Sequence, residues 1–180
     1  MMNHTKAGML KYLKENLSSI NILPLMVLRS RDFRMEEEKA VNAILKFAGN
    51  RPLAIRSSSS MEDTWEYSNA GKFESFLNVS PTHNAEREAV EKVYQSYQTD
   101  GDEEILIQPM LENVKKSGVA FTVDMNTFAD YYTVNFYEGD DSSAVTSGYS
   151  NELKTFVQYK YSEKPIRDRD MNSLITACRQ

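Results

Sequence analysis

The chain has 180 residues, of which 41% are hydrophobic and 26% charged. This is enough apolar material for one domain, or for two small lobes sharing a core, and it excludes wholesale disorder. No stretch approaches the roughly 20 apolar residues of a membrane span, and no signal-peptide pattern is present. A net charge of −5 argues against a general nucleic-acid binder, and one cysteine excludes a disulfide framework or a cysteine-based zinc site. Composition predicts a soluble, cytoplasmic protein.

The first half of the chain mixes helical and strand patterns. Apolar residues at helical spacing predict helices at residues 5–17, 35–48 and 85–98. Short apolar runs predict strands at residues 20–28, 53–56 and 74–79. Thr5 and Asn84 are the expected N-caps of the first and third helices. Pro24 within the first strand suggests an edge position or a bulge.

The pattern changes after the turn cluster at residues 99–102. A period of two then predicts strands at residues 105–111, 119–123, 131–137 and 153–159, followed by a helix from Asp170. The predicted class is α+β, with an N-terminal lobe at residues 1–101 and a second lobe of antiparallel strands and a C-terminal helix at residues 102–180. The helical pattern still runs at Gln180, which suggests that the second lobe is truncated.

Three features of the first lobe could bind a phosphate. Arg56 ends a strand and is followed by four serines, a set of donors that suits phosphate oxygens. Lys6 begins the first helix, where an ammonium and a helix N-terminus would both favour an anion. Gly71, next to Lys72, would let the backbone approach a ligand closely. A solvated serine loop, a solvated lysine and an ordinary turn are the alternatives, and residue types alone leave them open.

Gln108 lies within an apolar strand, where its carboxamide either crosslinks the backbone or faces a cleft and contacts a ligand. No metal-binding spacing includes His4 or His83, so no metal site is predicted. Asp140 and Asp141 are expected to form a solvated turn. Cys178 lies on the apolar stripe of the last helix and is expected to be a small core residue. Neither a nucleophile elbow nor a GK[ST] phosphate loop is present.

Three ordered segments resemble one family. LAIRSSSSMEDTWEYSNAGKFESFLNV is similar to the ATP-binding segment of pyruvate phosphate dikinase and phosphoenolpyruvate synthase. ILIQPMLENVKKSGVAFTVDMNT resembles the family's later segment around SGVAFT, and AVTSG its V.SG stretch. Order and spacing agree over roughly residues 6–148. The resemblance implies an ATP-grasp (PEP/pyruvate-binding) N-terminal domain, in which two lobes hold ATP.

Five positions match the family's motif residues. The resemblance implies that Lys6 and Arg56 contact the transferring phosphates and carry the catalytic charge. Gly71 matches the loop glycine whose backbone approaches the nucleotide. Ser75 stands where the family has a threonine and keeps the hydroxyl. Gln108 matches the glutamine of the hinge strand beside the adenine.

The chain also departs from the family. Asp124-Met125 replaces Asp-Pro, and residues 137–141 replace a GLGE stretch. The family's domain continues to an acidic D-x-E strand that holds Mg²⁺ and then a Q-x-R strand, and neither occurs here. The resemblance therefore implies ATP as the cofactor, Mg²⁺ ligands beyond residue 180, and a fragment that is inactive by itself. The parent would be an ATP-dependent kinase or phosphotransferase that transfers phosphate to a histidine.

The expected partners are ATP and, in a longer parent chain, phosphohistidine and PEP/pyruvate domains, with no nucleic acid and no membrane. Truncation of the second lobe would favour a dimer through the exposed face. Two alternatives to an enzyme fragment remain. One is a non-catalytic nucleotide-binding or structural module of ATP-grasp fold. The other is an interaction domain whose sheet edge pairs with a partner chain.

Overall fold

The computed structural model describes residues 5–59, 73–97, 102–139 and 152–180. The chain divides into two compact units, the first made of Met1–Asn16 and Asn21–Met110 and the second of Leu17–Ile20 and Leu111–Gln180. The first unit runs past the boundary expected at residue 101, because the strand at Glu104–Pro109 is an inner strand of its sheet. Both sheets are antiparallel and are accompanied by helices, as the predicted α+β class requires.

The first unit is built on a four-stranded sheet. Its order is β1 (Met26–Arg29), β4 (Glu104–Pro109), β2 (Leu53–Ser58) and β3 (Ser75–Val79). The pairing of β2 with β3 contains an irregularity between Leu53 and Ile55, near Asn78, whose φ is 56°. Asparagine tolerates this left-handed conformation better than most residues do.

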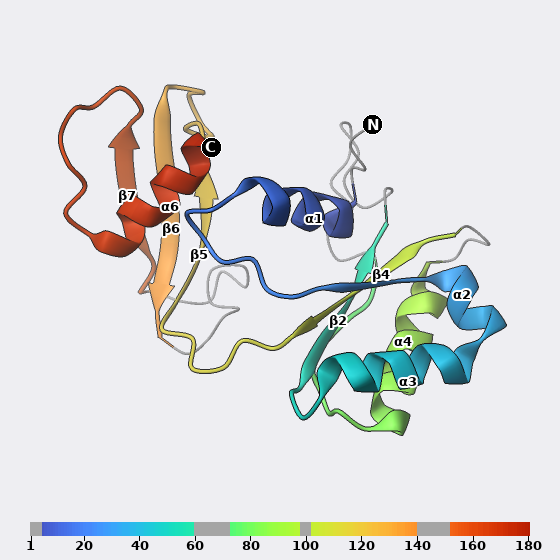
Figure 1. The fold of residues 1–180 in the computed structure, drawn as a ribbon. Helices are drawn as coiled ribbons and strands as arrows, with labels where there is room; N and C mark the ends of the chain where they lie inside the picture. The colour runs from blue at the N-terminus through green and yellow to red at the C-terminus, as the bar shows by residue number, and fades with distance from the viewer. Residues whose placement is uncertain (1–4, 60–72, 98–101, 140–151) are drawn as a thin grey trace. The chain divides into compact units, whose positions relative to one another are not determined.

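Three helices cover one face of this sheet: α2 (Ser30–Met35), α3 (Glu37–Ala48) and α4 (His83–Ser96). Figure 1 shows α3 and α4 side by side, with α4 packed on β2 and β4 and α3 in contact with β1. The core between helices and sheet contains fully buried aliphatic side chains from every layer: Val41, Ile44, Leu53, Ile55, Val90, Val93, Ile105 and Ile107. The opposite face of the sheet is therefore the one on which a ligand could lie.

Helix α1 (Lys6–Asn16) lies on that opposite face, where its first turn is hydrogen-bonded to β2 and β4. Ala7 is its buried residue and is completely inaccessible to solvent, so its small side chain allows the helix to approach the sheet closely. Thr5 Oγ1 accepts a hydrogen bond from the Gly8 amide at 3.0 Å, which confirms the predicted N-cap.

Three expectations for the first unit need correction. The strand predicted at residues 20–28 is confined to Met26–Arg29, because Pro24 has no amide hydrogen for a ladder and Leu17–Ile20 belongs to the second unit. Helix α2 at Ser30–Met35 was not predicted, and it ends where the helix predicted at residues 35–48 was expected to begin, so that α3 starts at Glu37. Helix α4 follows Thr82, so Asn84 lies inside its first turn and is not its N-cap.

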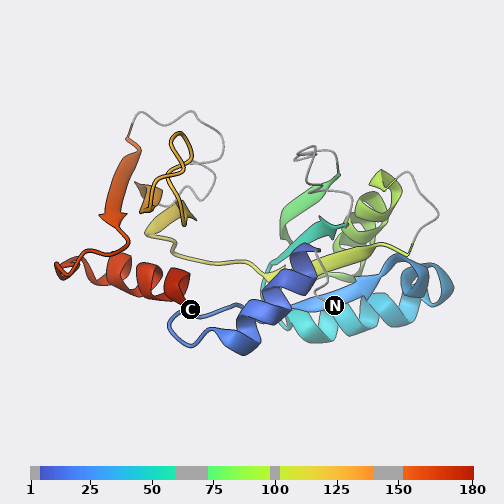
Figure 2. The same cartoon turned by 90° about the horizontal axis from the view of Figure 1, so that it is seen from above.

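In its described residues, the second unit is a three-stranded sheet with helix α6 on one face (Figure 2). The order is β5 (Lys116–Phe121), β6 (Tyr131–Glu138) and β7 (Lys154–Tyr159), and the helix is α6 (Arg169–Arg179). Its core pairs Tyr132 and Val134 of β6 with Met171 and Ile175 of α6. Within the sheet, a Cβ at Gly118 would lie 2.6 Å from the Asn135 carbonyl oxygen, so glycine is required there.

Charged contacts hold α6 to this sheet. Asp168 caps the helix by accepting hydrogen bonds from the amides of Asp170 and Met171, which lowers the pKa of its carboxyl. Lys116 Nζ lies 2.8 Å from Asp170 and 3.7 Å from Glu138, so one ammonium joins β5, β6 and α6. The two acidic residues at the start of α6 thus have structural roles, Asp168 as the N-cap and Asp170 as a partner of Lys116. Over the described residues, none of the helices is long and apolar enough to cross a membrane.

Candidate functional site

The candidate site is the face of the first sheet opposite α2, α3 and α4. Side chains alternate along a strand, so Ile55 points into the helical core and Arg56 points to the opposite face. Directly opposed residues of antiparallel strands share a face. Arg56 is opposed by Leu106 on one side and Ser75 on the other, which places these three residues in one row across the sheet.

Two further rows flank Arg56 on the same face. Gln108 opposes Ala54 in one, and Glu104 opposes Ser58 in the other. The register therefore brings Arg56, Ser75 and Gln108 to one face although they are widely separated in the sequence. The first turn of α1, which carries Lys6, lies on the same face through its bonds to Ser58 and Glu104. Gly71, the fifth expected site residue, is outside the described residues.

The polar groups at the centre of this face are available to a ligand. Arg56 and Ser75 are exposed and Gln108 is half-buried. Within the described ranges, the side chains of Arg56 and Gln108 make no hydrogen bond or ion pair. A guanidinium that is not neutralised internally can bind an anion through two parallel hydrogen bonds. Two roles were expected for the Gln108 carboxamide, a crosslink to the backbone or contact with a ligand. The lack of an internal partner favours contact with a ligand.

The serines after Arg56 differ from the expected flexible loop. Strand β2 continues through Ser58, and Ser57, Ser58 and Ser59 are 1%, 0% and 3% exposed. Ser58 Oγ accepts a hydrogen bond from the Ala7 amide at 2.9 Å. Its hydroxyl therefore supports α1 in place of acting as a surface donor for phosphate. Sequence reasoning missed this role because a run of serines gives no indication of which hydroxyl is buried.

The N-terminus of α1 also differs from the expected anion site. The amides of Ala7, Gly8 and Met9 donate to Ser58, to the Thr5 side chain and to the Thr5 carbonyl, respectively. These donors are therefore already used within the protein. Recognition of an anion here would depend on the exposed Lys6 side chain, with the helix dipole as a smaller contribution.

Tyr97 lies beneath this end of the sheet and joins β2 to β4. Its hydroxyl accepts from the Ser58 amide at 3.2 Å and donates to the Glu104 carbonyl, and the residue is 2% exposed. The residue pattern places Tyr97 on the apolar stripe of a helix, which is correct for its ring but does not reveal the role of its hydroxyl. Tyr97 thus fixes the relative position of the two residues that contact α1.

We expect Tyr97→Phe to lower the free energy of unfolding by about 1–2 kcal/mol, because it removes both hydrogen bonds from a buried position. Urea denaturation followed by circular dichroism measures this change. Tyr94→Phe is the matched control, since its hydroxyl has no partner within the described residues and its loss should change stability by less than about 0.5 kcal/mol. Equal stabilities of the two variants would contradict the role assigned to Tyr97.

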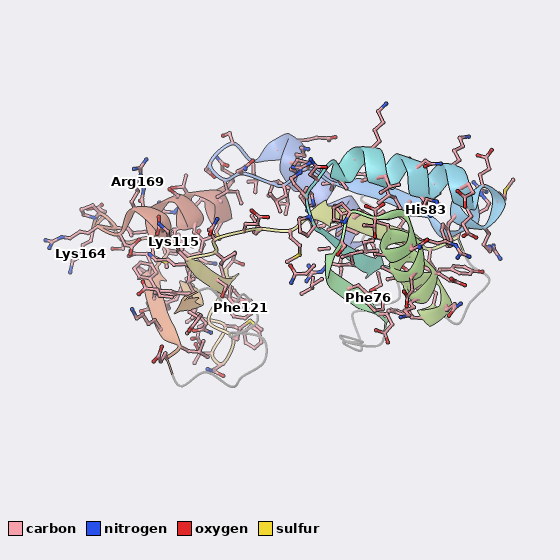
Figure 3. All side chains as sticks on the ribbon, turned by 90° about the horizontal axis from the view of Figure 1, so that it is seen from below. Phe76, His83, Lys115, Phe121, Lys164 and Arg169 are labelled. Carbon is pink, nitrogen blue, oxygen red and sulfur yellow. The ribbon has the colours of Figure 1, made fainter. Side chains whose placement is uncertain are left out.

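No metal centre accompanies this face in the described part of the chain, where no group of three or more His, Cys, Asp or Glu residues could hold an ion. His83, which Figure 3 labels on α4, instead pairs with Glu38 of α3. Its Nε2 lies 3.0 Å from the carboxylate oxygen of Glu38. Cys178 packs against the core of the second unit, and burial raises the pKa of its thiol. Asp140 and Asp141 lie outside the described residues.

Comparison with known proteins relates the first unit to a nucleotide-binding family. The family model described as "Pyruvate phosphate dikinase, AMP/ATP-binding domain" matches residues 2–102, which is more than half of the 180-residue chain. The match includes Lys6, Arg56 and Ser75, whereas Gln108 lies after it. No curated protein matches the chain significantly.

Among solved structures, the crystal structure of PH1788 from Pyrococcus horikoshii Ot3 is similar, with a TM-score of 0.43 and 15% sequence identity. The similarity covers 76% of this chain and 53% of that one. The chain therefore spans about half the length of that structure.

Proposed function

Because the chain belongs to the pyruvate phosphate dikinase AMP/ATP-binding domain family, we propose that its first unit binds ATP on the sheet face that carries Arg56. The observation that supports this most directly is the register of the sheet. It gathers Arg56, Ser75 and Gln108, with the Lys6 end of α1, on the face that the helical core leaves uncovered. Arg56 and Gln108 have no internal partner within the described residues, and such donors suit a ligand that is rich in acceptors.

Arg56 and Lys6 are the proposed phosphate ligands. Arg56 is a permanently charged guanidinium on an inner strand, so a regular sheet fixes its backbone. Lys6 is in the first turn of a helix whose dipole also favours an anion. Phosphoryl transfer depends mainly on positioning and charge neutralisation, which these two cations would supply.

Gln108 and Ser75 are proposed to contact other parts of the nucleotide. Gln108 can donate and accept hydrogen bonds through one carboxamide, which suits the edge of a purine. Ser75 is opposite Arg56 on β3 and would add a hydroxyl beside the phosphates. Gly71 is proposed to let the backbone approach the nucleotide, as its position in the motif implies.

We propose further that the chain has an ATP-grasp fold and belongs to a phosphotransferase that phosphorylates a histidine on another domain. Family membership supports this proposal. Magnesium has no assigned place here, because the described residues contain no cluster able to hold it. The alternative is a nucleotide-binding module that has no catalytic role. Measuring ATP turnover by a longer protein that contains this chain would distinguish a phosphotransferase from such a module.

Calorimetric titration of the protein with ATP, ADP, AMP and adenosine in the presence of Mg²⁺ tests the proposal. We expect saturable binding whose affinity increases with the number of phosphates, by about tenfold or more between adenosine and ATP, because the proposed contacts are cations on phosphate oxygens. Raising the salt concentration should weaken ATP binding more than adenosine binding. Absence of ATP binding, or equal affinity for adenosine and ATP, would overturn the proposed function.

A further inference from the structure

The residues on both sides of Lys6 are tied to the sheet by side chains that the family motif does not include in its ligand set. Before Lys6, Thr5 Oγ1 donates to Glu104 Oε2 at 2.8 Å. After it, the Ala7 amide donates to Ser58 Oγ at 2.9 Å. Lys6 is therefore held between two anchored neighbours, while its own side chain is exposed.

The two anchors are neighbours on the sheet. Glu104 of β4 and Ser58 of β2 are directly opposed, so their side chains stand side by side on one face. Tyr97 holds the same pair from beneath through the Ser58 amide and the Glu104 carbonyl. Thr5, Ala7 and Ser58 are at most 6% exposed, which shields both hydrogen bonds from water.

Within the described residues, Ala7 is the side chain that α1 buries completely. Leu10 and Leu13 are half-buried, and Met9 and Tyr12 are 39% and 44% exposed. Complete burial is therefore confined to the first turn of the helix, beside the two polar anchors. The buried contacts of Thr5 and Ala7 determine where the helix begins on the sheet, and hence where the Lys6 backbone lies.

We propose that Glu104 and Ser58 are positioning residues that hold Lys6 in place to neutralise the phosphates of the bound nucleotide, an inference that rests on the proposed function. Ser58 lies two residues from Arg56 on the same face of β2, a separation of about 7 Å. This brings the anchored turn within reach of the same anion as Arg56. The acidic side chain of Glu104 acts on the Thr5 hydroxyl and not on the ligand.

The test measures Mg-ATP and adenosine affinity for the wild type and for Glu104→Ala, Glu104→Gln and Lys6→Ala. We expect Glu104→Ala to weaken ATP binding by about tenfold, as a misplaced lysine loses its phosphate contact, with adenosine affinity changed by less than about twofold. Glu104→Gln keeps an acceptor for Thr5 and should bind ATP within about threefold of the wild type. Glu103→Ala is the charge-matched control, because Glu103 contacts Ser30 through its backbone.

The double variant Lys6→Ala with Glu104→Ala distinguishes positioning from general damage. If Glu104 acts through Lys6, the double variant binds ATP as weakly as Lys6→Ala alone, because no further contact can be lost. Additive losses, an unchanged ATP affinity of Glu104→Ala, or equal losses for ATP and adenosine would overturn the inference. A wild-type protein that binds no ATP would overturn the proposed function itself and the inference with it.

Hydrogen exchange of the α1 amides provides a readout that needs no nucleotide. Glu104→Ala and Ser58→Ala should speed exchange in the first turn of α1, whereas Lys6→Ala should leave it unchanged. Unchanged exchange in both anchor variants would contradict the anchoring of this helix, whatever the result with ATP.

Discussion

Replacement of Glu86 by leucine is expected to raise the free energy of unfolding by about 3 kcal/mol at pH 8. Glu86 is in the first turn of α4, on the buried stripe of that helix, and is completely inaccessible to solvent. Neither of its carboxylate oxygens has a hydrogen-bond partner among the described residues. A charged group in such a position is costly, and an apolar side chain of similar size removes that cost.

The pH dependence follows from the pKa of Glu86. Burial raises this pKa from 4.5 to about 7, and the nearby His83 opposes the shift to a smaller extent. Between these two values the folded protein binds more protons at this residue than the unfolded chain does, so its contribution to stability falls as the pH rises. The contribution of Glu86 to the free energy of unfolding is fully present below about pH 4.5, and it has been lost above about pH 7.

Urea denaturation of the wild type and Glu86→Leu from pH 5 to pH 8 measures this effect. The difference between the two proteins should grow with pH, and the titration of groups that do not interact with Glu86 cancels in the difference. His83 with Glu38 and Arg87 with Glu37 are the ion pairs between α3 and α4 near this position, and both variants retain them.

Glu88→Gln is the control for Glu86. Glu88 is exposed on the same helix and pairs with Lys92, which lowers the pKa of its carboxyl. Its replacement should have a small effect that does not increase with pH. A constant difference between Glu86→Leu and the wild type across this pH range would show that Glu86 remains charged in the folded protein.

Replacement of Arg56 by alanine is expected to weaken ATP binding by about 10- to 100-fold, with little change in adenosine affinity. Arg56 is exposed on the candidate site face and has no internal partner within the described residues, so its removal should not destabilise the fold. Arg56→Lys retains the charge but loses the planar fork and should recover part of the affinity. Calorimetric titration with Mg-ATP measures all of these values.

Arg51→Ala is the matched control for Arg56→Ala. It also removes an arginine side chain, but from the turn between α3 and β2. Arg51 is exposed and donates to the carbonyls of Ala48 and Phe47 at the end of α3. Its loss should leave ATP affinity within about twofold of the wild type. Equal effects of the two substitutions would mean that Arg56 acts only through the overall charge.

The local elements of this protein follow from its sequence. The helical spacing of Val90 and Val93 and the period of two after residue 104 predict α4 and the later strands, because amphipathic patterns depend on neighbouring residues alone. Helix α2 was missed because Phe33 is its only buried apolar residue and its neighbours are mostly charged. The resemblance around Arg56 also indicated the family without any structure.

Which of these residues meet depends on the tertiary structure. The class, most of the elements and the family could be predicted from the residues alone, and so could Lys6 and Arg56 as cations for an anionic ligand. Only the pairing of β2 with β4 placed Ser58 beside Glu104, and only the packing of α1 joined them to Ala7 and Thr5. Residue types cannot reveal such contacts, since they depend on the register of strands that are far apart in the chain.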